Sequence, residues 1–151
     1  MPLQSLLAPA RIATLAGPLD RDQVLDAAAR LMAGDMPALE ASIAASLHQR
    51  ERMGSTAIGH GVAIPHGRCG TTRVARAAFL RLEHPVAFDA ADSQPVDLVF
   101  ALAVPEHFTQ QHLQLLSELA GYFALAANRE ALRAAPGPDA LRALLLRDEA
   151  A

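Results

Sequence analysis

Lysine is absent from the 151 residues, so all 13 basic side chains are arginines. The 16 acidic residues outnumber them, and the formal net charge is −3. Nucleic-acid binding depends on clustered positive charge that displaces counterions, so a general nucleic-acid partner is not expected. Cysteine occurs once, at Cys69, which excludes an internal disulfide and favours a reducing compartment.

Long apolar runs are also absent. No window approaches the ~20 consecutive apolar residues of a membrane-spanning helix, so stable membrane insertion is not expected. The first eleven residues have no basic region ahead of an apolar core, and we predict no signal peptide there and a cytoplasmic location. Hydrophobic residues make up 52% of the chain and charged residues 19%. This composition predicts one packed domain over residues 1–151.

The periodicity of apolar residues predicts helices before, between and after strands. Asp20 and Gln23 have the spacing of a capping box at the start of a helix that ends at Gly34. The run 96–104 is almost continuously apolar, which is typical of a strand covered on both faces. The sequence therefore predicts an α/β fold with a mixed central β-sheet flanked by helices on both sides. Further strands are expected near 11–16, 62–64 and 74–83, and further helices near 37–52, 110–126, 129–134 and 138–147.

His66 is the first candidate for chemistry. Pro65 fixes its own φ and Gly67 tolerates unusual backbone conformations, so we expect His66 at a sharp exit from a short strand. A neutral imidazole is nucleophilic near pH 7 and suits phosphoryl transfer. The alternative, judged on this residue alone, is a histidine that only caps or binds a loop carbonyl.

Neighbouring residues could complete a phosphate site. Arg50 or Arg52 could supply a forked donor at the end of the second helix, and a solvated helix end is the expected explanation for one of the two. Ser55 and Thr56 offer hydroxyl groups, with an ordinary turn as the alternative. Gly67 is counted with them as phosphate-binding. Backbone N–H groups at Gly54, Gly59 and Gly61 could also approach an oxyanion.

His112 lies near the start of the helix that follows strand 96–104. Loops beyond the carboxyl ends of strands gather at one rim of an open α/β sheet, so His66 and His112 could meet there. The competing interpretation is a metal site built from His60, His66, His107 and His112. Their spacing does not match a helical zinc pair, and Cys69 has no second cysteine, so we predict no metal ligands.

One segment resembles the signature of a known family. The pattern Glu51-x6-Ile58-Gly59-x2-Val62-Ala63-Ile64-Pro65-His66-Gly67 is similar to that of type-2 enzyme IIA domains. These domains belong to the bacterial phosphoenolpyruvate-dependent phosphotransferase system, in its fructose, mannitol and nitrogen-related branch. Residues 50–56, 85–105 and 112–113 resemble the nitrogen-related members.

The resemblance implies a phosphohistidine at His66, formed on Nε2 from an HPr-like carrier. It implies His112 beside it and Arg50, rather than Arg52, on the phosphoryl group, because Arg50 holds the family's place ahead of Gly54. It also implies the same mixed sheet and no cofactor. A nitrogen-related regulator with regulatory target proteins is the first expectation. The alternative is a sugar-transport enzyme IIA that passes phosphate to a fructose- or mannitol-type enzyme IIB.

Three departures from the family concern partner choice. His60 stands where nitrogen-related members commonly have asparagine, which predicts a third imidazole near the site. The segment 67–76 is one residue shorter than in similar proteins, and residues 107–111 differ from theirs. A domain that kept the fold and lost the transfer is the remaining alternative.

Overall fold

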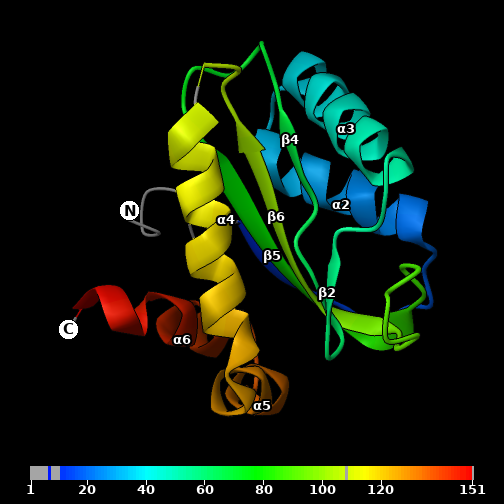
Figure 1. Ribbon diagram of the computed structural model, residues 1–151, viewed down its shortest axis with the longest axis vertical. Coiled ribbons are helices and arrows are strands. Elements are labelled where there is room, and N and C mark those ends of the chain that lie inside the picture. Colours follow the sequence, from blue (N-terminus) through cyan, green and yellow to red (C-terminus); the bar gives the residue numbers. More distant parts are fainter. Residues whose placement is uncertain (1–6, 8–10, 108, 151) are drawn as a thin grey trace.

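In the described residues, one strand is followed by two helices, a run of five strands and three final helices, so helices lie before, between and after strands as the sequence predicts (Figure 1). The computed structural model describes residue 7, residues 11–107 and residues 109–150; most of the segment tested for a signal peptide lies outside these residues. The strands are β1 (Ile12–Leu15), β2 (Ala57–Gly59), β3 (Val62–Ala63), β4 (His66–Arg68), β5 (Arg76–Val86) and β6 (Val96–Val104). The helices are α2 (Arg21–Ala33), α3 (Pro37–Arg52), α4 (Thr109–Ala124), α5 (Ala126–Ala134) and α6 (Pro138–Ala150).

The six strands form one mixed sheet in the order β1-β5-β6-β3-β2, and β4 also pairs with β6. β6 pairs antiparallel with β5 on one side. On its other side it pairs parallel with β3 and then with β4. The predicted mixed sheet is therefore confirmed.

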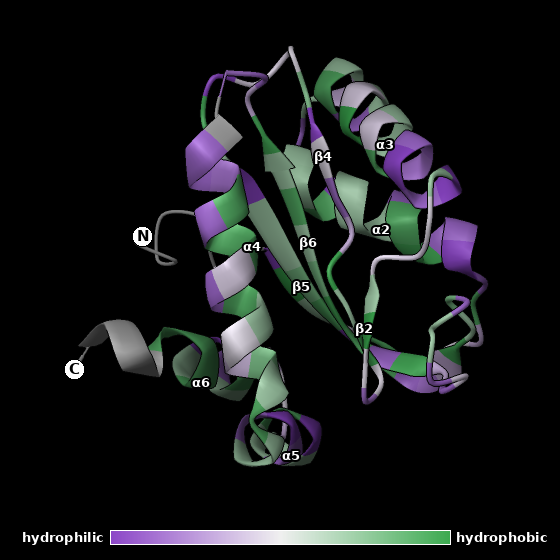
Figure 2. Cartoon of the chain, viewed as in Figure 1, coloured by the Kyte–Doolittle hydropathy of each residue, from purple (hydrophilic) through white to green (hydrophobic). Residues whose placement is uncertain are grey.

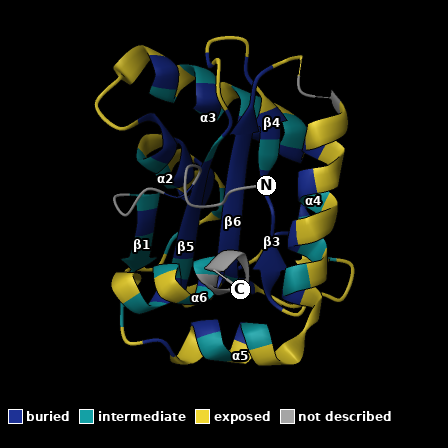
Figure 3. Ribbon diagram, turned by 90° about the vertical axis from the view of Figure 1, so that its left-hand side faces the viewer, coloured by how far each residue is buried: buried dark blue, intermediate teal, exposed yellow. Residues whose placement is uncertain are grey.

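β6 is buried along nearly its whole length, as its continuous apolar sequence predicts (Figure 3). Successive side chains point to opposite faces, so Val99 and Ala101 pack with α2 and α3, while Phe100 and Leu102 pack with α4, α5 and α6. Hydrophobic residues fill the sheet and the inner faces of the helices, and polar residues gather outside (Figure 2). The predicted helices on both sides of the sheet are confirmed.

Local signals place the first helix. The Asp20 side chain accepts a hydrogen bond from the Gln23 N–H at 2.8 Å, and the Gln23 side chain accepts one from the Asp20 N–H at 2.9 Å. This reciprocal pair satisfies two N–H groups that no helical carbonyl can reach. Gly34 ends the helix with φ 64°, a backbone conformation that residues with a Cβ rarely adopt.

Two short strands, β2 and β4, were not predicted, whereas β3 is the strand expected near 62–64; together they position the candidate nucleophile. β2 and β3 form a hairpin, after which the chain continues along β6 and resumes pairing at β4. The Leu102 N–H donates to the Pro65 carbonyl at 2.9 Å, so the chain stays on β6 across the proline. His66 therefore begins a strand rather than leaving one, which corrects the predicted sharp exit.

Candidate active site

His66 is held by the sheet and by its own ring. It pairs in register with Leu102, and its Nδ1 lies 2.8 Å from the Ile64 carbonyl oxygen. A carbonyl only accepts hydrogen bonds, so Nδ1 carries the hydrogen and Nε2 keeps a free lone pair in the neutral ring. His66 does bind a loop carbonyl, as the alternative interpretation held, but this bond leaves Nε2 available as a nucleophile.

His112 meets His66 at one rim of the sheet. The ring centroids are 5.2 Å apart with an interplanar angle of 84°, an edge-to-face contact. β4 pairs parallel with the last residues of β6 and α4 follows β6, so both histidines lie near the carboxyl end of β6. The predicted meeting of the two rings is confirmed. His112 is only 7% exposed, and its Nε2 has no hydrogen-bond partner among the described residues.

Both imidazoles are neutral near pH 7. Burial lowers the pKa of His66 and the Arg50 charge lowers it further, while the hydrogen bond to Ile64 and the Glu51 carboxylate oppose these effects. Burial, the neighbouring His66 and the Arg68 charge lower the pKa of His112 to about 4. A nucleophilic imidazole must be unprotonated, so this environment keeps His66 in its reactive form.

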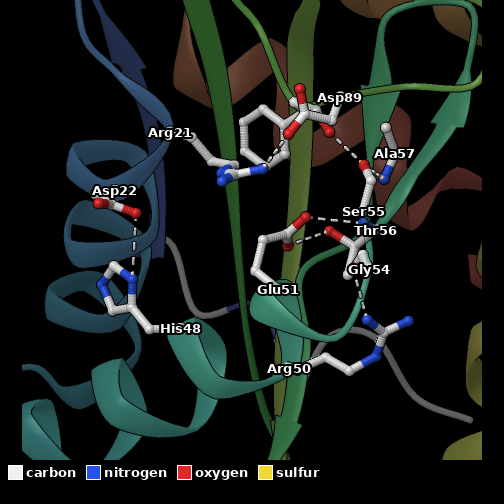
Figure 4. Close-up of polar contacts among 11 residues, drawn as sticks. Arg21, Asp22, His48, Arg50, Glu51, Gly54, Ser55, Thr56, Ala57 and Asp89 are labelled. Carbon is white, nitrogen blue, oxygen red and sulfur yellow. Dashed lines mark hydrogen bonds and ion pairs between the residues drawn. The ribbon is translucent and has the colours of Figure 1, made fainter.

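A cavity of about 500 Å³ opens beside the two rings. Arg50 lines it from the last turn of α3, and its Nη1 donates to the Gly54 carbonyl at 2.8 Å (Figure 4). The remaining guanidinium N–H groups are the kind that bind phosphate oxygens in pairs. Arg52 is exposed and does not line this cavity. Of the two candidate arginines, the structure brings only Arg50 to the histidines.

The hydroxyl groups of Ser55 and Thr56 are engaged inside the protein (Figure 4). Thr56 Oγ1 donates to the Glu51 carboxylate at 2.6 Å, and the Thr56 N–H donates to the same carboxylate at 2.8 Å. Ser55 Oγ donates to the Phe88 carbonyl and accepts from the Ala57 N–H. Each hydroxyl has one hydrogen, which is already donated. Both residues line a smaller cavity with Arg50 and His66, and a phosphate-binding role for them stays a prediction.

Gly67 does not have the unusual backbone conformation that was expected of it, and its phosphate-binding role stays a prediction. Its φ is not positive, unlike that of Gly34, Gly54, Gly59 and Gly61. A Cβ on Gly67 would overlap with Oγ of Ser46 and lie 3.0 Å from the Ser46 carbonyl oxygen. The missing side chain therefore lets α3 approach β4 closely, which brings Arg50 to the cavity.

His60 is not a third imidazole of this site, which corrects the prediction. His60 and Gly61 form the β2–β3 turn with φ values of 57° and 79°. The His60 carbonyl accepts a hydrogen bond from Arg133 at 2.6 Å, and both residues line a cavity near the start of β6. Histidine and asparagine share a tolerance for this left-handed conformation, so turn geometry accounts for His60 where relatives have asparagine.

The structure also places the glycines proposed as backbone donors and the histidines proposed as metal ligands. Gly59 and Gly61 belong to the β2–β3 hairpin and do not line the cavity beside His66. Within the described residues, no three side chains of the metal-binding types come together to hold an ion. His60 lies at the other end of β6 from His66, so it cannot share a metal ion with His66 and His112.

Arg68 was missed by the sequence analysis. It lines the cavity with His66 and His112, and its charge contributes to the lowered pKa of His112. Residues two apart in a strand share a face, so His66 and Arg68 point to the same side of β4. The sequence would have indicated that Arg68 points to the same side as His66 only if a strand had been predicted over 66–68.

The sequence profile described as "Phosphoenolpyruvate-dependent sugar phosphotransferase system, EIIA 2" matches residues 5–148. The chain belongs to this family, whose members are phosphotransfer components. A nitrogen regulatory protein of Pseudomonas aeruginosa is 41% identical over 140 residues, which cover 92% of this chain and 91% of that protein. This chain is therefore similar to the nitrogen regulatory members.

Solved structures support the same fold. The nitrogen regulatory protein IIA-Ntr from Neisseria meningitidis superposes with a TM-score of 0.87 at 38% identity, covering 95% of this chain and 98% of that one. A complex of Escherichia coli enzyme IIAMTL with phosphorylated enzyme IIBMTL superposes with a TM-score of 0.75 at 17% identity, covering 91% and 94% of the chains. The second likeness concerns the fold alone. In the part of the chain that the structure describes, no helix is long and apolar enough to cross a membrane.

Proposed function

We propose that this chain is a phosphocarrier that accepts a phosphoryl group on Nε2 of His66 from an HPr-like protein and acts as a nitrogen-related regulator. The observation that supports the proposal most directly is the Nδ1 hydrogen bond to Ile64, which leaves a neutral ring with a free Nε2 beside a cavity. Membership in a phosphotransfer family and 41% identity to a nitrogen regulatory protein support it independently.

The proposed transfer is a displacement at phosphorus. The Nε2 lone pair of His66 forms the new N–P bond, the N–P bond to the donor's histidine breaks, and its electron pair returns to the donor's ring. Arg50 binds the phosphoryl oxygens, and its charge offsets the negative charge they carry in the transition state. His112 lies close enough to contact the same group, and no metal or organic cofactor takes part.

Incubation with labelled phosphoenolpyruvate, enzyme I and an HPr-like carrier tests the proposal. The wild-type protein should gain an acid-labile, base-stable phosphate, and His66→Ala should gain none. His60→Ala is the matched control, because this histidine is exposed and lies at the other end of β6; it should label like the wild type. Equal labelling of His66→Ala would refute the site assignment.

The second candidate function is sugar transport, in which phosphate passes on to an enzyme IIB. The family description names sugar systems, and one similar fold was solved in complex with a phosphorylated enzyme IIB. Adding a fructose- or mannitol-type enzyme IIB to the labelled protein separates the two. Rapid loss of label from this chain to enzyme IIB supports transport, whereas retention supports the regulatory role. For either role we propose a cytoplasmic location, supported by the free thiol of Cys69.

A further inference from the structure

The His112 ring carries one of the buried side-chain nitrogens that lack a hydrogen-bond partner among the described residues. It is 7% exposed and lies edge-to-face with His66, and its Nε2 is buried with no hydrogen-bond partner among the described residues. A buried polar atom normally has a partner, because burial without one is costly. The ring also borders the cavity that would receive a phosphoryl group in the proposed function.

We propose that phosphorylation of His66 is coupled to proton uptake by His112, so that the phosphorylated protein holds one proton more than the free protein. The proposal rests on the proposed function, since it concerns the state that transfer produces. Beyond the bonds of the transfer, one O–H bond of a solvent hydronium ion breaks and one N–H bond forms on the His112 ring. The added proton comes from water and binds the His112 ring, which then carries two N–H groups and a positive charge beside the phosphoryl oxygens.

Electrostatics decide whether the proton binds. The pKa of His112 is about 4 because of burial and the nearby His66 and Arg68, so its proton affinity must rise about a thousandfold for half-protonation at pH 7. A phosphoryl group carries roughly −1.5 to −2 charges near pH 7. At about 5 Å and an effective dielectric of about 20, each negative charge raises the proton affinity by roughly a few hundredfold. The phosphoryl group therefore supplies more than the required increase.

Other charges around the cavity modify this balance without reversing it. Arg68 on β4 and Arg50 on α3 oppose protonation of His112, and Arg50 does so less once its N–H groups bind the phosphoryl oxygens. The Glu51 carboxylate favours positive charge on His66. On α4 itself, the neighbours Gln111 and Leu113 are uncharged.

Proton uptake makes the phosphorylation equilibrium depend on pH. Free His112 is neutral above about pH 5, so each unit of decrease in pH favours the phosphorylated protein by about tenfold wherever His112 is protonated only in that form. The protein would then report acidity as well as the phosphorylation state of its donor. Between pH 7 and 8.5 the effect is separate from protonation of free His66, whose pKa is lowered from 6.5.

Nuclear magnetic resonance of the 15N-labelled histidine rings tests the coupling directly. The full chain is phosphorylated at His66 with phosphoramidate, a small phosphoryl donor. At pH 7.5 the His112 ring should show one protonated nitrogen in the free protein and two in the phosphorylated protein. A phosphorylated His66 beside a neutral His112 overturns the coupling and leaves the proposed function intact. Failure of both phosphoramidate and an HPr-like donor to modify His66 refutes both.

A variant supplies a second readout. At a fixed ratio of phosphorylated to free HPr-like donor, the equilibrium fraction of phosphorylated protein is measured from pH 7 to 8.5. Both proteins are measured with the same donor, so the titration of the donor cancels in the ratio of the wild-type constant to the His112→Gln constant. Because glutamine does not titrate, the pH dependence that remains in this ratio comes from His112. This ratio should fall about tenfold per unit increase in pH in the range where only phosphorylated His112 binds the proton. A ratio that does not change with pH contradicts the coupling.

Discussion

Replacing Gly67 with alanine tests how the site is assembled. A Cβ at this position would overlap with Oγ of Ser46 and lie 3.0 Å from the Ser46 carbonyl oxygen and 3.1 Å from its carbonyl carbon. Rotation of the Ser46 side chain would relieve the first overlap but break its 3.0 Å hydrogen bond to the Arg68 carbonyl, at a cost of about 1 kcal/mol. The remaining contacts are with backbone, so α3 must move.

Overpacking of this kind costs about 1–3 kcal/mol. Together with the lost hydrogen bond, we expect the free energy of unfolding to fall by about 2–4 kcal/mol and Tm by roughly 4–16 °C. Phosphoryl transfer should slow as well, because Arg50 follows Ser46 by one helical turn and moves with it. Urea unfolding followed by circular dichroism measures the stability, and the labelling assay measures the transfer.

Two further variants make the test specific. In a Ser46→Ala background, Gly67→Ala should cost about 1 kcal/mol less than in the wild type, because the overlapping oxygen is gone. Gly121→Ala is the control. A Cβ added to this exposed glycine in α4 would have no other atom within 4 Å, so alanine should stabilise the helix by up to about 1 kcal/mol. A cost below about 0.5 kcal/mol for Gly67→Ala would show that close approach of α3 to β4 is not what the glycine provides.

Three other changes probe the site and its surroundings. Arg50→Lys should slow transfer by roughly ten- to a hundredfold with the fold intact, because lysine lacks the forked donor, whereas Arg52→Lys should match the wild type in the same assay. His60→Val should lower the free energy of unfolding by about 1–2 kcal/mol, because a β-branched residue is strained at φ 57°, and His60→Asn should leave the urea midpoint nearly unchanged. The wild-type free energy of unfolding should decrease as pH falls from 6.5 toward 4, because unfolded His112 takes up a proton that the folded protein excludes; a decrease of equal size in His112→Gln would contradict this source.

The fold was largely predictable because its signals are local. The capping box at Asp20 and Gln23 and the apolar run of β6 each depend on a few neighbouring residues, and the structure confirms both. β4 was not predictable in this way. Its three residues adopt a strand because they pair with β6, more than 30 positions later, and nothing in a window of such length indicates that pairing.

The site was partly predictable for the same reason. His66 and Arg50 were identified from their neighbouring residues and from the family resemblance, and the structure places both at one cavity. The internal bonds of Ser55 and Thr56 depend on Phe88 and Glu51, partners that the pattern of residues does not specify. Arg68 was missed because its direction follows from the unpredicted strand β4.

The pairing of β4 with β6 also affects how such a protein can change. His66 begins a strand that pairs with the buried β6, so the sheet fixes the backbone that carries the nucleophile. The rim of the cavity is different: Met53 is 80% exposed and Leu113 is 64% exposed. Substitutions there cost little stability. Descendants of such a protein can therefore acquire new partners by varying the rim while the nucleophile stays fixed.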